Sequence, residues 1–235
     1  MKIVALCLLM SLSSFSWVFG QYSYSGKAQY KVTYNYSVDR SELKDDNKNI
    51  PSNIQNDIRE AHRLVDKMTG KLIFNNVASI YHSPRSINSD NMVDIIASGA
   101  VRSDHTYYHN RTKKVFIIEN RAFGGARRSL DDREMIWNIL PEKAIINGIE
   151  CQKAEGIFKT PGFTDTVVEV WFAPDIPFPY GPTNAYGLPG LILKYKWGFL
   201  EIEVNKIKRI TDGSVELIIP DFGDIPLLSG SVREN

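Results

Sequence analysis

The side chains most able to do chemistry are one thiol and a pair of histidines. Cys151 could act as a nucleophile if one of the four histidines served as its base. It lies, however, in an alternating apolar stretch directly after a hairpin turn, where a free cysteine behaves as a small hydrophobic residue. We therefore predict that Cys151 is a buried structural thiol.

His105 and His109 suggest a metal site, because this spacing on a helix would place both imidazoles on one face. The aromatic residues between them are typical of a strand instead. Four strand positions at about 3.3 Å each separate the two residues by roughly 13 Å, which is too far for one ion. We expect exposed hairpin histidines, and the sequence predicts no metal ion or other cofactor.

Other catalytic signals are weak. The chain contains no Gly-x-Ser-x-Gly elbow, no His-Glu-x-x-His helix and no glycine-rich phosphate loop. Asp165 and Glu169 have the surroundings of ordinary strand residues. Trp137, Trp171 and Trp197 could form a stacking platform for a sugar or a peptide, but tryptophans on separate strands are more typical of a core. We predict no catalytic residue.

Residues 1–20 have the features of a cleavable signal peptide. Lys2 precedes an apolar run at residues 3–10, and small residues around Gly20 suit a signal peptidase. We expect cleavage there and one β-rich domain over residues 21–235, with no later membrane span. Its single cysteine excludes an internal disulfide, so its stability must come from packing.

The charge of the expected mature chain is balanced. Removing residues 1–20 takes one lysine, Lys2, from 28 basic residues and leaves 27 against 27 acidic ones. Nucleic acids and anionic membranes normally require a basic excess. We therefore expect neither as a partner.

Alternating apolar and polar residues predict many short strands. The clearest begins at Tyr30, and Asn147-Gly148 is the strongest hairpin signal, because both residues tolerate the positive φ of a type I′ turn. Residues 39–53 and 121–134 are polar and are expected to be loops. The predicted strands are 29–38, 71–81, 105–109, 114–119, 135–140, 143–146, 149–158, 166–172, 191–196, 199–208 and 215–219.

One helix is predicted, at about residues 54–69, from apolar residues at helical spacing between a start signal and Gly70. Residues 83–103 stay open, with 90–96 either a short strand or an edge segment. The fold class expected is mainly β. We predict an antiparallel meander that forms a strongly curved sheet or open barrel, covered on one side by this helix.

The string Gly-Leu-Pro-Gly-Leu-Ile at residues 187–192 resembles the signature of the GLPGLI family. Further pieces of the same pattern lie around it, over about residues 135–205. The residues that carry the resemblance are Trp137, Cys151, Trp171, Pro174, Ile176, Pro177, Phe178, Tyr180, Gly181, Pro182, Gly187, Leu188, Pro189, Gly190, Leu191 and Ile192.

The resemblance implies an exported protein of Bacteroidota-type bacteria, whose relatives are often encoded near TonB-dependent outer-membrane transporters. It implies no reaction and assigns no catalytic residue.

In physical terms, Pro189-Gly190 fits positions i+1 and i+2 of a type II turn, with Leu188 tucked under the sheet. The string is thus expected to be a structural corner, with a surface for a partner as the alternative. The proline-rich loop before it is expected to project Phe178 and Tyr180 for contact with a partner.

The expected function is an exported, non-enzymatic binding or accessory protein of a bacterial envelope, located in the periplasm or at the outer membrane. Its partner would be an outer-membrane transporter or another envelope protein, and its ligand apolar or a peptide. Two alternatives stay open. One is a periplasmic carrier of an apolar molecule, which needs a roomy cavity under the sheet. The other is a hydrolase acting on peptides or glycans, which needs titratable groups that converge in a cleft.

Overall fold

The computed structural model describes residues 28–42, 50–85, 91–121, 127–130, 134–159, 165–210 and 217. The predicted signal peptide at residues 1–20 lies outside these ranges. Most of the strand predicted at 215–219 does so as well.

The described strands form one antiparallel sheet in the order β6-β5-β4-β3-β2-β1-β11-β10-β9-β8-β7. Every neighbouring pair is antiparallel, and the two end strands do not pair with each other, so the predicted curved antiparallel sheet is confirmed as an open one. The strands are β1 (Gln29–Val38), β2 (Thr69–Phe74), β3 (Ala78–His82), β4 (His105–Asn110), β5 (Val115–Asn120), β6 (Arg127–Leu130), β7 (Glu134–Ile146), β8 (Ile149–Lys159), β9 (Thr166–Ala173), β10 (Leu191–Trp197) and β11 (Leu200–Ile210).

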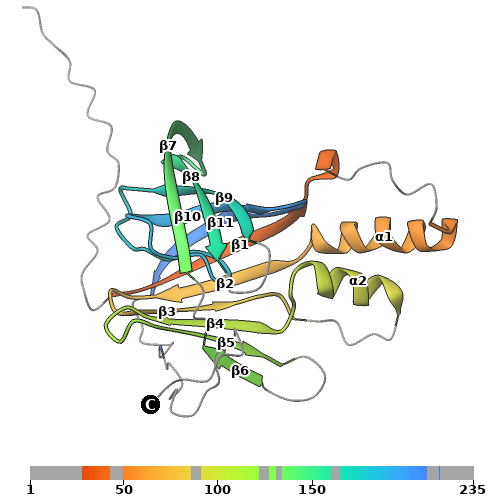
Figure 1. The fold of residues 1–235 in the computed structure, drawn as a ribbon, viewed down its shortest axis with the longest axis horizontal. Helices are drawn as coiled ribbons and strands as arrows, with labels where there is room; N and C mark the ends of the chain where they lie inside the picture. The colour runs from red at the N-terminus through yellow and green to blue at the C-terminus, as the bar shows by residue number, and fades with distance from the viewer. Residues whose placement is uncertain are drawn as a thin grey trace, which may run out of the picture.

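The sheet is strongly curved. In Figure 1 the green strand β7 crosses steeply over the direction of β2 and β3, although all three belong to the same sheet. Irregularities in register between Thr33 and Tyr34, Ile192 and Lys194, and Ile139 and Lys143 accompany this curvature. Such bulges bend a strand and increase its twist. The strands therefore form two arms, β2–β6 and β7–β10, on either side of β1 and β11.

Two helices lie beyond one end of the sheet (Figure 1). The predicted helix is α1 (Ser52–Val65), which ends earlier than expected because Thr69 already starts β2. The second, α2 (Met92–Ala100), occupies the segment whose structure the sequence left open. Asn91 caps α2 by accepting a hydrogen bond from the backbone N–H of Asp94 at 2.9 Å.

The two helices pack against each other, and α1 also packs against β1 of the sheet, so the predicted packing helix is confirmed. The buried side of α1 consists of Ala61, His62 and Val65. Within the described residues, neither helix has the length and apolar character needed to cross a bilayer.

Turns separate several strands as the sequence predicts. Asn147 and Gly148 have φ values of 50° and 77° and connect β7 to β8. In two segments the structure contains more strands than the sequence predicts. The strand expected at 71–81 is a hairpin of β2 and β3, and the loop expected at 121–134 contains β6. β6 escaped the sequence analysis because its four residues are mostly polar and depend on pairing with β5.

The concave side of the sheet holds an aromatic core. Alternate residues of β1, including Tyr30, Tyr34 and Tyr36, point into it and are buried. Opposite residues on the same strands form the outer face. On β1 and β2 this alternation gives one buried side and one more exposed side, whereas on β3 to β6 the opposite side carries a second buried cluster of Ile80, Tyr108, Ile117 and Leu130.

Candidate functional site

The segment between β9 and β10, residues 174–190, fills the concave side of the sheet and is called the plug below. The Phe178 ring lies 4.9 Å from the ring of Phe74, and the Tyr180 ring lies 5.6 Å from that of the β4 residue His109. Phe178 and Tyr180 were expected to project for contact with a partner. This prediction is wrong, because both side chains are buried, with relative exposures of 5% and 0%.

Hydrogen bonds tie the plug region to β7 and to the central strand β1. The indole N–H of Trp137 on β7 donates to the carbonyl oxygen of Tyr186 at 2.8 Å. The Tyr34 hydroxyl on β1 donates to the carbonyl oxygen of Ile192, just after the plug, at 2.7 Å. A rigid loop with prolines thus serves packing rather than display here.

The Gly-Leu-Pro-Gly-Leu-Ile string turns the chain from the plug into β10, but not through the predicted type II turn. That turn requires a positive φ at Gly190, whereas the positive φ, 97°, is found at Gly187. Gly190 is needed for another reason. A Cβ atom there would lie 2.2 Å from the carbonyl oxygen of Ala173. Leu188 is buried under the sheet as expected, at 1% exposure.

The residues that carry the family resemblance differ in their exposure to solvent. Most of them line the core, and the exposed ones are prolines and one glycine. Cys151, Ile176, Phe178, Tyr180, Gly181, Pro182, Leu188, Gly190, Leu191 and Ile192 are buried, Trp137 and Trp171 are half-buried, and Pro174, Pro177, Gly187 and Pro189 are exposed.

The candidate chemical residues of the sequence do not converge. Cys151 is fully buried, and its burial raises the pKa of its thiol to about 11, which makes the nucleophilic thiolate rare near neutral pH. Trp137, Trp171 and Trp197 form no platform, because they have different neighbours. Trp171 lies beneath the Lys153 ammonium group and Trp197 beneath a guanidinium group.

His109 was expected to be an exposed hairpin residue, and this is wrong. It is buried beside Tyr180 and Tyr186, and its Nδ1 atom has no hydrogen-bond partner among the described residues. Burial, helped by the positive charge of Arg111, lowers the pKa of His109 to about 4. His109 is therefore a neutral core residue near pH 7.

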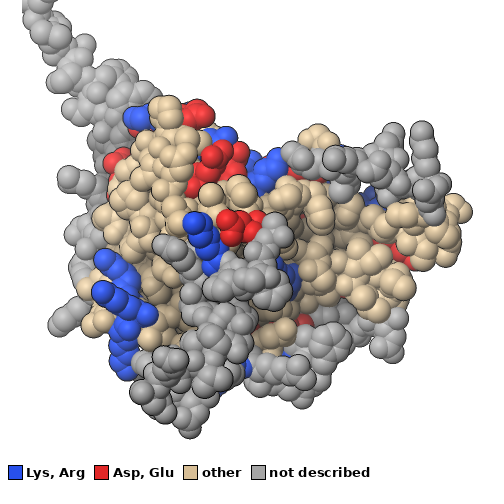
Figure 2. All heavy atoms as spheres, viewed as in Figure 1, with Lys and Arg blue, Asp and Glu red and all other residues tan. Residues whose placement is uncertain are grey.

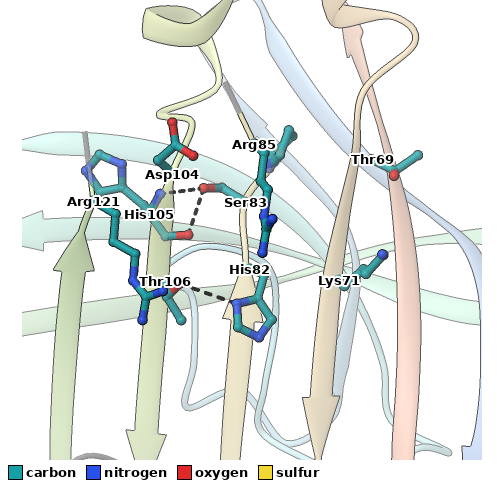
Figure 3. Close-up of a pocket in the computed structure, with 10 residues that line it drawn as sticks. Thr69, Lys71, His82, Ser83, Arg85, Asp104, His105, Thr106 and Arg121 are labelled. Carbon is teal, nitrogen blue, oxygen red and sulfur yellow. Dashed lines mark hydrogen bonds between the residues drawn. The ribbon is translucent and has the colours of Figure 1, made fainter. Parts of the chain in front are cut away.

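A pocket of about 370 Å³ lies on the outer face of the sheet, where β2, β3 and β4 meet the loop that follows α2 (Figure 3). Neighbouring strands bring Lys71, His82 and Thr106 into one cross-strand row. His82 Nδ1 lies 3.3 Å from Thr106 Oγ1. The described residues of the lining are Thr69, Lys71, His82, Ser83, Pro84, Arg85, Asp104, His105, Thr106 and Arg121.

Arg121 is held at the pocket by a buried carboxylate. Its Nε donates to Glu119 Oε1 at 2.5 Å, and Arg128 Nε donates to Glu119 Oε2 at the same distance. Burial alone would raise the pKa of Glu119, but the hydrogen bonds from the two guanidinium groups outweigh burial and hold that pKa below its usual value. Glu119 therefore stays ionised and holds the Nε atom of Arg121 in place.

The rim of the pocket is a constrained loop. The Ser83 hydroxyl donates to the carbonyl oxygens of Arg102 and His105, at 2.9 and 2.8 Å, and accepts from the His105 backbone N–H. Arg102 and Asp104 have positive φ values of 47° and 60°. Such backbone conformations cost energy in residues other than glycine, and they cluster at functional sites.

The hydroxyl and imidazole groups of the pocket contact the backbone and one another. The Ser83 hydroxyl donates to backbone carbonyl oxygens, and the His82 ring contacts the Thr106 hydroxyl. Within the part of the chain that the structure describes, no three His, Cys, Asp or Glu side chains form a metal-binding group.

The sequence pattern does not reveal this site. Lys71, His82 and Thr106 come from three strands, and only the register of the sheet brings them together. Arg85 lies in residues 83–103, which the sequence leaves open, and Arg121 begins a segment that is predicted to be a polar loop. The polar side of the alternating pattern was the one available signal.

Comparisons with known proteins add a family match. A family model described as "Protein of unknown function (Porph_ging)" matches residues 147–194, which include the Gly-Leu-Pro-Gly-Leu-Ile string. The match is consistent with a Bacteroidota-type family. No curated protein matches.

Among solved structures, two of PNGF-II, in P21 and C2 crystal forms, are similar at 16% identity with TM-scores of 0.47 and 0.48. The similarity covers 78% and 83% of this chain but 29% of each PNGF-II chain. This chain therefore spans less than a third of their length, and the likeness carries no inference about function.

Proposed function

We propose that this chain is an exported, non-enzymatic binding protein of a bacterial envelope, and that it holds its ligand in the pocket on the outer face. The observation that carries the proposal is the contrast between the two sides of the sheet. The concave side is packed with rings from β1, β2, β4 and the plug. The outer face has a polar hollow of about 370 Å³ with a constrained rim.

The two alternatives are less well supported. A carrier of apolar molecules needs room under the sheet, and Phe178 and Tyr180 occupy that region. A hydrolase needs a nucleophile or water activated by a base, and the hydroxyl of Ser83 already donates to backbone oxygens. Binding requires neither of these features.

Export and partnership with a TonB-dependent transporter are part of the proposal through the family resemblance. In such an arrangement the protein would hold a ligand near the transporter. The pocket then presents the ligand, and the plug keeps the curved sheet rigid.

The test is to purify the mature protein from its native envelope and to identify the small molecules and proteins that co-purify. We expect a small molecule that is released unchanged and that protects the amides of residues 69–71, 82–85 and 104–106 from hydrogen exchange. A preparation that carries nothing, or one that converts the molecule chemically, would contradict the proposal.

A further inference from the structure

The charges around the outer-face pocket are unbalanced. Lys71, Arg85 and Arg121 line it with positive charge, while Asp104 is the one carboxylate among the described residues of the lining. Figure 2 shows acidic and basic side chains next to one another over the upper and central parts of the face in view, with a further group of basic side chains at its lower left. The described lining of the pocket thus carries a positive excess in a chain with a formal net charge of +1.

Two of these cations have no neutralising partner among the residues that the structure describes. Neither Lys71 nor Arg85 forms an ion pair with a described residue. By contrast, lysines elsewhere on the sheet are paired, as with Lys153 and Glu169 at 2.8 Å. Positive groups that gather without counter-charges raise the potential in a hollow and attract anions.

Neutral hydrogen-bonding groups lie between the cations. Burial lowers the pKa of His82, and the charges of Arg121, Lys71 and Arg85 lower it further, so its imidazole is neutral near pH 7. The Thr106 hydroxyl is 3.3 Å from the same ring. A cationic hollow with a neutral imidazole and a hydroxyl in its wall offers both charge and directed hydrogen bonds to an oxyanion.

We propose that this pocket binds a ligand through an oxyanion group, a carboxylate, sulfate or phosphate, with Lys71, Arg85 and Arg121 as the charged contacts. This inference rests on the proposed binding function and narrows it to one chemical class. Arg121 is the orienting contact, because Glu119 fixes its Nε and a further interaction with Tyr108 holds its guanidinium group beside Thr106 in the pocket wall. Lys71 and Arg85 supply attraction from the other strands.

Asp104 limits which anions fit. Its positive φ of 60° fixes the backbone at the rim, and its carboxylate lines the hollow. A negative charge there repels an anion that approaches from that side. Asn tolerates positive φ as well as Asp does, so Asp104→Asn removes the charge without new strain.

Three probes test the class of ligand by isothermal titration calorimetry at low ionic strength with the full chain. They are inorganic phosphate, glucuronate and glucose, where the last two share a ring and differ in charge. We expect both anions to bind, with affinity that falls as salt is added, and glucose to bind at least about tenfold more weakly than glucuronate. Equal affinity for glucuronate and glucose, or no binding of either anion, would overturn the inference.

Variants then locate the charged contacts. Lys71→Gln and Arg85→Gln should each weaken phosphate binding about tenfold, because each removes a charge-assisted hydrogen bond. Lys208→Gln, an exposed lysine on β11 outside the lining, removes the same charge and should change affinity less than twofold. Asp104→Asn should strengthen binding severalfold.

The outcomes separate the two proposals. One outcome is an envelope molecule that binds in the pocket with the same affinity for wild type and for the double variant Lys71→Gln, Arg85→Gln. This result would overturn the proposed oxyanion contacts and would leave the proposed binding function intact. Failure of every probe and of every envelope molecule to bind would overturn both. Unfolding temperatures of all variants check that each one folds, and Arg85 is exposed, so Arg85→Gln keeps the test valid if Lys71→Gln does not fold.

Discussion

The plug and the outer-face pocket lie on opposite sides of one sheet and differ in what they leave available. In the plug, Phe178, Tyr180 and Leu188 are buried, and the carbonyl groups of Tyr186 and Ile192 accept hydrogen bonds from the sheet. In the pocket, Lys71 and Arg85 have no ion-pair partner among the described residues. The plug engages its backbone carbonyl groups within the fold, and the pocket keeps two cations without an ion pair among the described residues.

The difference between the plug and the pocket matters for interpreting the family match. The matched residues, 147–194, include the plug and the first four residues of β10, and they exclude the described lining of the pocket, which lies between Thr69 and Arg121. The recognisable residues therefore define a scaffold. The match is silent about the ligand, which the other half of the chain would select.

The substitution that we expect to have the largest effect on stability is Gly190→Ala in the plug. The new Cβ would meet the Ala173 carbonyl oxygen, which belongs to the backbone of β9 and cannot move aside cheaply. We expect a loss of about 3 kcal/mol or more in the free energy of unfolding, measured in urea. Gly99→Ala is the matched control, because nothing lies within 4 Å of a Cβ there and alanine favours a helix. Equal stabilities for the two variants would contradict the assignment.

The next largest effect is the pH dependence that His109 gives to the core. Its pKa in the folded state is about 4, below the ordinary value of 6.5, so the unfolded chain takes up the proton first as pH falls. The stability contribution is thus full above pH 6.5 and is lost between about pH 6.5 and 4. We expect this loss to be about 2 to 3 kcal/mol.

The measurement for His109 is urea unfolding of wild type and His109→Phe across pH 4 to 7. Carboxylates titrate in both proteins, so the difference between the two curves isolates the histidine. Parallel curves would show that His109 is accessible to protons in the folded state, contrary to its buried position.

A smaller effect is expected from Tyr34→Phe. This change removes the hydroxyl that donates to the Ile192 carbonyl oxygen at 2.7 Å and leaves that oxygen buried without this donor. The loss should be about 1 to 2 kcal/mol in the free energy of unfolding. A change below a few tenths of a kcal/mol in the same urea assay would mean that water or another group replaces the bond.

The sequence predicts those features of the two regions that depend on interactions between residues close together in the chain. The alternation at Tyr30, Tyr34 and Tyr36 is local, so the strand and its buried side could be predicted. The Asn147-Gly148 turn is local as well. Gly190 was predicted to be structural for the wrong reason, because its contact with Ala173 depends on how β9 and β10 lie together.

Other features depend on pairing that no short stretch of sequence encodes. Helix α2 has an N-cap at Asn91, but its short apolar run also suits a strand, and its packing against α1 decides the matter. His109 looks like an exposed hairpin residue until the plug covers it. The pocket needs the register of β2, β3 and β4, which sets Lys71 opposite His82 and His82 opposite Thr106.

The smallest effect on stability is expected from substitutions in the outer-face pocket. Lys71→Gln and Arg85→Gln should change the free energy of unfolding by less than about 0.5 kcal/mol, because exposed groups without ion-pair partners contribute little to stability. Thermal and urea unfolding of both variants measure this. A loss above about 1 kcal/mol would mean that the pocket is part of the scaffold.

The most direct test of the central claim is to map a bound anion by NMR on the ¹⁵N-labelled full chain. Titration with glucuronate should shift the amide signals of residues 69–71, 82–85, 104–106 and 121, while those of residues 176–192 stay in place. Titration with glucose should shift neither set. Shifts centred on residues 176–192, or equal shifts with both sugars, would contradict the assignment of the outer-face pocket as the binding site and the plug as its scaffold.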